Sequence, residues 1–352
     1  MKERVGGLII LLVVIVAAGA YSFFRGIQPD PVEVTGLLGG EKIGLFESED
    51  FKTYIKDEYG LTMDYRKAGS FDMVQGSLEG QDYLFPASQL AGELFKKEGH
   101  QASRTDIVFN TPVVLYSRKP VVEALEKEGL VSQREGVYYV HMEKLAKTIA
   151  AETPWKDLGL PQLYGNVLVD TTDPNKSNSG NMFLGLLANA LNGNRVVDGT
   201  TAPEVIPDLQ KIYALIGYME SSSADMFSQF LKQGMGSYPL IAGYENQLLE
   251  FSKTDPDVYQ QIKDQVYILY PEPTVWSSHV YIALNPEAER GLEALKDPKI
   301  QDMAWKNHGF RTVVSGTGSS GLYEIPGLAD DITQVMPMPD IQTMLTLMAA
   351  VE

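Results

Sequence analysis

The sequence of 352 residues contains no cysteine and only four histidines. The lack of cysteine excludes disulfide bonds, thiol catalysis and cysteine metal sites. None of the histidines (His100, His141, His279 and His308) has the spacing of a metal-binding pair. The chain also lacks the phosphate-binding pattern GxxxxGKS/T, a GxGxxG segment ahead of a helix, and the glycine that a serine nucleophile elbow requires. We therefore expect neither an enzyme nor a cofactor.

Positive charge is also scarce, with 29 Lys and Arg residues against 46 Asp and Glu residues and a formal net charge of −17. An acidic surface argues against nucleic acid or an anionic membrane surface as the partner. The hydrophobic content of 44% and the charged content of 21% are those of an ordinary globular protein. The length favours two domains of about 150 residues each.

A long uncharged run, Val5 to Phe24, follows Lys2 and Arg4. Twenty residues at a helical rise of 1.5 Å span about 30 Å, the thickness of the hydrocarbon core of a bilayer. A cleaved signal is the alternative, because residues 18–20 (Ala-Gly-Ala) suit a cleavage site. The length favours an N-terminal membrane anchor in residues 1–25, with a cytoplasmic N-terminus and the body extracellular or periplasmic. Residues 26–40 are predicted to be a linker because of their glycines.

From Glu41 onwards, predicted strands alternate with helices, which indicates a parallel sheet with crossover connections. The predicted strands are Lys42 to Phe46, Leu61 to Tyr65 and Tyr83 to Ala87. Ligands of such sheets bind at the carboxyl ends of the strands. Ser48, Ser70 and Ser88 fall at the predicted strand-to-helix junctions, although helix capping by itself would explain each of them.

The β-type run Ile107 to Tyr116 contains Thr111-Pro112, and the proline argues against a single continuous central strand. We interpret this break as a connection that leaves one sheet and enters another. The strand His279 to Leu284 is predicted to cross back. The predicted lobe 1 comprises residues 41–110 plus 277–352, and lobe 2 comprises residues 111–276.

The clearest binding signal lies in the stretch 167–194, where a short strand, a polar loop and an apolar helix follow one another. The loop contains Ser177, Asn178, Ser179 and Gly180. The first N–H groups of a helix have no partner within it, and the macrodipole adds a partial positive charge there. Together with the hydroxyl groups they predict a pocket for an oxyanion or a carboxylate. The competing hypothesis is that one of the serines caps the helix.

Glu245 follows a predicted strand that ends near Tyr244. If Glu245 faces the cleft, it opposes an anion and favours an amine or a metal-bearing ligand. If it is structural, it pairs with an arginine or lysine. The cost of a buried, unpaired carboxylate favours the structural role.

Four segments carry a resemblance: TDPNKSNSG at 172–180, AGYENQLLEF at 242–251, ILYPEPTVWSSHVYIAL at 268–284 and KNHGFRT at 306–312. With the order of the lobes, they resemble the type 2 periplasmic-binding-protein fold, and most of all the bacterial extracellular solute-binding proteins related to the molybdate and sulfate receptors. The resemblance implies an α/β fold of two lobes joined by two crossings, here preceded by the transmembrane helix. It also implies a ligand held between the lobes by Ser48, Ser70, Thr111, Ser177, Asn178, Ser179, Gly180 and Tyr244.

The resulting functional hypothesis is a membrane-tethered, monomeric protein that captures a small anionic or carboxylate-bearing solute for an ABC permease. The alternative is a membrane-anchored sensor or interaction protein that uses the same fold without transport. The predicted anchor and the tail after Arg311, which extends beyond the usual end of the family, favour the alternative. The chemistry of the predicted cleft favours solute binding.

Overall fold

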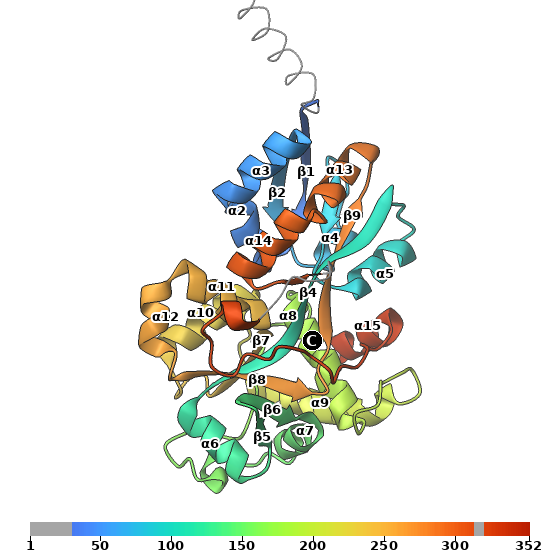
Figure 1. Cartoon of the computed structure of the whole chain (residues 1–352). Coiled ribbons are helices and arrows are strands. Elements are labelled where there is room, and N and C mark those ends of the chain that lie inside the picture. The colour runs from blue at the N-terminus through green and yellow to red at the C-terminus, as the bar shows by residue number, and fades with distance from the viewer. Residues whose placement is uncertain (1–29, 313–319) are drawn as a thin grey trace, which may run out of the picture.

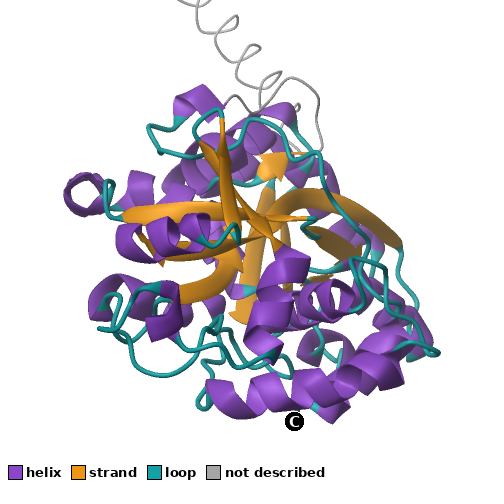
Figure 2. Cartoon of the chain, turned by 90° about the horizontal axis from the view of Figure 1, so that it is seen from below, coloured by secondary structure: helices purple, strands orange, loops and turns teal. Residues whose placement is uncertain are grey.

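The computed structural model describes residues 30–312 and 320–352, which form two α/β lobes, one above the other in Figure 1. One strand, β4 (Arg104–Arg118), runs through both lobes, and β9 (Trp276–Ala283) pairs with the part of β4 that belongs to lobe 1. In Figure 2 the strands lie in the interior and the helices surround them. The two-lobed α/β prediction is confirmed.

Lobe 1 is built on a sheet of order β2-β1-β3-β9-β4. Its strands β1 (Val32–Leu38), β2 (Leu61–Lys67) and β3 (Tyr83–Phe85) are parallel, and β9 joins β3 in the antiparallel sense. The helices of this lobe are α2 (Ile43–Glu47), α3 (Glu49–Tyr59), α4 (Asp72–Gln75), α5 (Gln89–Lys97), α13 (Pro286–Leu295) and α14 (Pro298–His308), with η1 (Gly40–Lys42) after β1.

Lobe 2 contains the strands β5 (Val131–Arg134), β6 (Val137–His141), β7 (Leu240–Tyr244) and β8 (Val266–Glu272). Its helices are α6 (Lys119–Lys127), α7 (Met142–Ala150), η2 (Trp155–Leu158), α8 (Asn178–Leu191), α9 (Ala202–Ile216), α10 (Ser223–Gln233), α11 (Glu245–Thr254) and α12 (Pro256–Ile262). The chain ends with β10 (Arg311–Thr312), η3 (Ser320–Leu322) and α15 (Ile341–Ala350).

The first crossing lies where the sequence places it, but the strand does not break. Residues 104–112 of β4 pair with β9, and residues 113–118 pair with β7 and, in part, β8. Pro112 stands where one set of partners ends and the next begins, so its missing N–H interrupts neither ladder. The prediction that the proline ends the strand is wrong for this reason.

The predicted linker 26–40 and the predicted strand 42–46 are both corrected by the structure. Residues 32–38 form β1, in which Val34 and Leu38 are buried, and residues 43–47 form the helix α2. Gly36 is one of the glycines that predict an irregular linker, but it is a packing position. A Cβ there would collide with the backbone oxygen and ring of Tyr83 on the adjacent β3.

The sequence predicts the C-terminal segment to be part of lobe 1, but residues 320–352 pack mainly on lobe 2. Tyr323 and Ile325 join the core of that lobe, and α15 packs on α8 and α9 through Met344 and Leu347. Within the described ranges, no helix is long and apolar enough to cross a bilayer. The predicted anchor in residues 1–25 lies outside these ranges.

Candidate ligand site between the lobes

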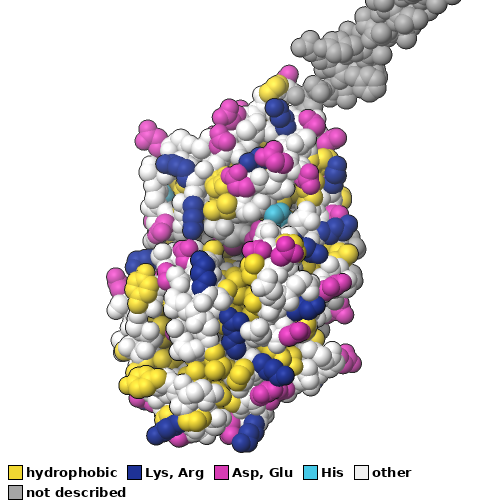
Figure 3. Space-filling model, turned by 90° about the vertical axis from the view of Figure 1, so that its left-hand side faces the viewer, with side chains coloured by type: hydrophobic (Ala, Val, Ile, Leu, Met, Phe, Trp, Pro, Cys, Tyr) yellow, Lys and Arg dark blue, Asp and Glu magenta, His cyan; other side chains and the backbone are white. Residues whose placement is uncertain are grey.

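A polar cavity of about 390 Å³ lies between the lobes. Lobe 1 supplies Gly39, Gly40, Glu41, Lys67, Ala68, Gly69, Ser70 and Asp72, and lobe 2 supplies Lys176, Ser177, Asn178, Ser221, Ser222 and Ser223. The waist between the lobes is visible in the space-filling view of Figure 3.

The wall from lobe 1 is the carboxyl edge of its parallel sheet. β1 and β2 run in register, so that Leu38 and Lys67 end their strands side by side. The chain then turns through Gly39 and Gly40 at one strand end and through residues 68–70 at the other. The Ser70 hydroxyl accepts a hydrogen bond from the backbone N–H of Ala87 at 2.9 Å, which holds this turn against the end of β3.

The wall from lobe 2 contains the N-terminus of α8. Ser177 occupies the N-cap position, but its side chain makes no capping bond. Its Oγ lies 3.0 Å from the Oγ of Ser179, which in turn lies 2.7 Å from the Oγ1 of Thr172. The first N–H of α8 that bonds back is that of Asn181, to the oxygen of Ser177. The hydroxyl groups therefore form a chain beside the helix end and do not cap it, and the first N–H groups of α8 have no partner within the helix.

A second helix, α10, also begins at this cavity. Its N-cap residue is Ser222, again without a side-chain capping bond. The ammonium group of Lys67 reaches across from lobe 1 and donates to the Ser222 hydroxyl at 3.4 Å. Two helix N-termini and one lysine thus converge on the same space, and each favours negative charge.

The carboxylates at the cavity are partly compensated. Glu41 forms an ion pair with Lys42, whose Nζ also lies 3.1 Å from Nδ1 of His279. Burial lowers the pKa of Lys42, and burial together with the nearby Lys42 lowers the pKa of His279 well below its usual value. Lys176 pairs with Asp173 at 2.8 Å, and Asp72 also lines the cavity.

The structure gathers most of the predicted residues. Ser70, Ser177 and Asn178 line the cavity, and Ser179 and Gly180 lie directly behind it in α8. Asn178 donates through Nδ2 to the oxygen of Ala87 in lobe 1 at 3.0 Å and to the hydroxyl of Tyr244 at 2.8 Å. The Tyr244 hydroxyl therefore helps to hold the Asn178 amide in position at the cavity.

Two further predicted residues, Thr111 and Ser48, neither line the cavity nor bond to a residue that lines it. Thr111 is wholly buried on β4 and accepts a hydrogen bond from the N–H of Asn246 at 3.3 Å. Ser48 is the N-cap residue of α3, and it follows the helix α2 instead of a strand. It consequently lies away from the carboxyl edge of the sheet, and its prediction as a site residue is not supported by this geometry.

Sequence reasoning missed Lys67, the Gly39-Gly40 turn and the serines of α10. The run Ser221 to Ser223 precedes a helix, as the polar loop before α8 does. This pattern could have predicted the second helix N-terminus at the cavity. The glycine turn was hidden because β1 was interpreted as a linker.

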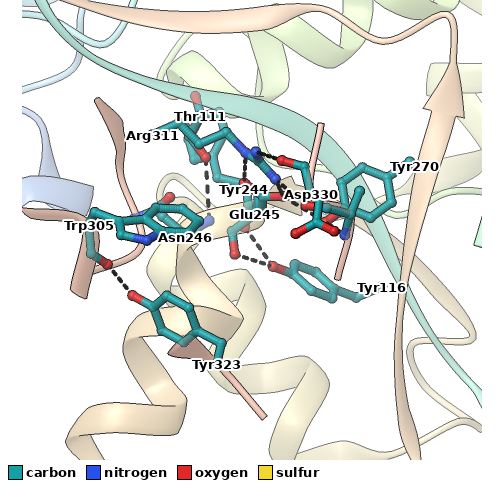
Figure 4. A network of polar contacts seen from close by, with 11 residues as sticks. Thr111, Tyr116, Tyr244, Glu245, Asn246, Tyr270, Trp305, Arg311, Tyr323 and Asp330 are labelled. Carbon is teal, nitrogen blue, oxygen red and sulfur yellow. Dashed lines mark hydrogen bonds and ion pairs between the residues drawn. The ribbon is translucent and has the colours of Figure 1, made fainter. Parts of the chain in front are cut away.

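Glu245 has the structural role that the sequence favoured, as Figure 4 shows. Its carboxylate is fully buried and accepts from Nε and Nη2 of Arg311 at 2.6 and 2.8 Å and from the hydroxyl of Tyr270 at 2.6 Å. Arg311 also donates to the oxygens of Ala329 and Asp330. The pair thus joins α11 of lobe 2 to β10 and to the tail.

Searches with the sequence found no matching family model and no matching curated protein. Solved structures do match the fold. The Trichodesmium protein IdiA (FutA), in complex with iron and citrate, has a TM-score of 0.57 at 12% identity, over 91% of this chain and 97% of that one. The sulfate-binding protein SubI from Mycobacterium tuberculosis has a TM-score of 0.54 at 15% identity, over 85% and 93%. Apo ferric ion-binding protein A from Pasteurella haemolytica has a TM-score of 0.57 at 14% identity, over 91% and 95%.

These similarities extend over almost the whole of each chain. The protein therefore has the two-lobed fold of the periplasmic solute-binding proteins, as the sequence predicted. At 12 to 15% identity the similarity establishes the fold and leaves the ligand to be argued from the cavity.

Proposed function

We propose that the protein is an extracellular or periplasmic solute-binding protein that holds a small anionic or carboxylate-bearing solute between its lobes. The polar cavity carries this proposal, because the N-termini of α8 and α10 and the ammonium group of Lys67 converge on it. Such a set of donors binds an anion without a dedicated metal ion. Two structural neighbours are a sulfate-binding protein and a protein in complex with iron and citrate, and both sulfate and citrate are anions.

In this proposal the predicted helix at 5–24 tethers the protein to the membrane, and the captured solute passes to an ABC permease. The protein acts as a monomer, because one chain supplies both walls of the cavity.

The direct test is calorimetry with the full chain in lipid nanodiscs and a panel of sulfate, phosphate, molybdate, citrate and short carboxylates. Lys67→Ala should weaken the best anion about ten- to a hundredfold, because a hydrogen bond to a charged group contributes about 1.5–3 kcal/mol. Lys52→Ala is the matched control, since Lys52 pairs with Glu47 on the surface. Unchanged affinity in Lys67→Ala, or no binding by any anion, contradicts the proposal.

The second candidate is a sensor or interaction protein, and the tail favours it. α15 contacts α5 of lobe 1 as well as α8 and α9 of lobe 2, and Lys97 of α5 donates to Gln342 of α15 at 2.6 Å. A segment that touches both lobes responds to their movement. Uptake of the identified anion by cells with and without the gene separates the two candidates: unchanged uptake supports the sensor.

A further inference from the structure

The polar cavity continues into a second space of different character. A groove of about 440 Å³ runs between α10 and α11 and ends against α12. Its lining shares Gly40, Glu41 and Ser223 with the polar cavity, so the two spaces meet at the N-terminus of α10. In Figure 3, hydrophobic side chains gather below the waist between the lobes.

The walls of the groove are largely apolar. Its apolar lining residues include Phe227 and Leu231 of α10, Phe251 of α11 and Ile262 of α12. The rings of Phe227 and Phe251 are in edge-to-face contact with each other. From Ser223 to Leu231 the helix advances by about 12 Å, at 1.5 Å per residue. The groove is therefore long enough for a chain of several carbon atoms, whereas an inorganic oxyanion leaves it empty.

Asn246 also lines the groove, and its environment is unusual. The residue is fully buried, and neither Nδ2 nor Oδ1 of its amide has a hydrogen-bond partner within the described part of the chain. A buried amide without a partner is costly and uncommon. Its two unsatisfied atoms indicate a polar group that arrives with the ligand.

We infer that the ligand is an organic anion with an apolar arm. The anionic group lies among the N-termini of α8 and α10, and the arm lies along the groove between α10 and α11. A hydroxyl or amide near the base of the arm bonds to Asn246. This inference rests on the proposed function, because the same cavity holds the anionic group.

The test is a calorimetric series on the full chain in lipid nanodiscs, with empty nanodiscs as the blank. The probes are straight-chain carboxylates from acetate to hexanoate and alkylphosphonates from methyl to hexyl. We expect affinity to rise about three- to fourfold per added methylene until the groove is full, as the burial of a methylene group predicts. Affinity that is independent of chain length overturns the inference and leaves the proposed function intact. If no probe binds, both are overturned.

A variant that fills the groove locates the arm. Ser228 lines the groove in the middle of α10, and Ser228→Trp should reduce the affinity for hexylphosphonate to that for methylphosphonate, which itself stays unchanged. Gln229→Trp is the matched control, since Gln229 is on the same helix but outside the lining. An undiminished chain-length effect in Ser228→Trp places the arm elsewhere and overturns the inference.

The amide of Asn246 is tested separately with a variant of similar volume. The unaltered protein should prefer 2-hydroxyhexanoate to hexanoate by about tenfold, the usual effect of one hydrogen bond in a buried site. Asn246→Leu should abolish this preference and retain the dependence on chain length. Equal affinity for the two acids in the unaltered protein contradicts the assignment of Asn246.

Discussion

At the scale of single residues, two serines of one loop have different surroundings. Ser177 lines the polar cavity, whereas Ser179 is buried behind it and bonded to Thr172. Neither hydroxyl caps α8. The two residues therefore differ: Ser177 is placed to contact a ligand, Ser179 is placed to hold the loop, and neither acts as a helix cap.

Ser177→Ala should lower the affinity for the bound anion about ten- to a hundredfold and change the free energy of unfolding by less than about 1 kcal/mol. Ser179→Ala should lower the free energy of unfolding by about 1–3 kcal/mol, because it leaves the buried Thr172 hydroxyl without this partner. Calorimetry and urea unfolding measure the two effects. A Ser177→Ala protein that loses stability yet binds normally would show that this hydroxyl is structural.

The buried carboxyl group of Asp170 should make the stability of the protein depend on pH. Burial raises its pKa to about 7, above the value of about 3.9 that is usual for the unfolded chain. Between these values the folded state binds a proton that the unfolded state has lost, so this contribution to stability falls as the pH rises from about 4 to about 7 and is constant above that. The stability advantage of Asp170→Asn over the unaltered protein should therefore be larger at pH 8 than at pH 5 by about 2–4 kcal/mol.

Urea unfolding at pH 5 and pH 8 gives that comparison. The difference between variant and unaltered protein removes the opposite contribution of His279, whose lowered pKa costs stability as the pH falls below its usual value. An equal pH dependence in both proteins contradicts the assignment to Asp170.

At the scale of elements, the position of α8 depends on two glycines of different kinds. A Cβ at Gly180 would collide with the backbone oxygen of Thr172 in the loop before the helix. A Cβ at Gly185 would meet the end of the Met338 side chain in the tail, which has room to rotate. The first contact sets how closely the N-terminus of α8 approaches the loop.

Gly180→Ala should lower the free energy of unfolding by about 1–3 kcal/mol despite the better helix propensity of alanine, because the helix end must shift. It should also weaken anion binding, since the N–H groups of the first turn move with it. Gly185→Ala is the control in the same helix and should lower the free energy of unfolding by less. Circular dichroism during urea unfolding measures both, and a larger cost at Gly185 contradicts this account of the docking.

At the scale of the whole molecule, the two lobes are joined at β4, at β9 and through Arg311. The Asn178 amide and the Lys67 ammonium group bridge the cavity from opposite lobes. Hinge closure around a ligand is a common motion of two-lobed receptors. We expect the lobes to close about the crossings near Thr111 and Ser277.

A ligand that binds only the closed form should stabilise the protein by about 2.7 kcal/mol at a concentration of one hundred times Kd. The correct anion should therefore raise the melting temperature and reduce the radius of gyration in solution. Scanning fluorimetry and small-angle X-ray scattering measure these changes. A rise in melting temperature without compaction argues for a site that does not depend on closure.

The body from residue 28 onwards should be soluble and monomeric without the predicted anchor. Its described segments bury their apolar faces, and large exposed hydrophobic side chains are scattered, with Tyr164 and Tyr218 the most exposed of those described. Light scattering should give the mass of one chain. An obligate oligomer contradicts the monomeric proposal.

The sequence by itself determined the alternation of strands and helices, the crossing near Thr111 and the polar start of α8. These features depend on patterns over a few residues, where apolar periodicity and helix-start residues act directly. The pairing of Glu245 with a basic residue was also predictable, because a buried carboxylate requires a partner.

Only the tertiary structure decided which residues meet. Lys67 and Ser222 are far apart in the sequence, and they are brought together by the packing of the two lobes. Gly36 locally predicts an irregular linker, yet it pairs with β2 and β3 and packs closely against Tyr83. The groove beside α10 likewise exists only because α11 and α12 pack next to it. These contacts form between segments that are distant in the sequence, and no local pattern predicts which segments will meet. The shape of the cavity was therefore not predictable from the sequence.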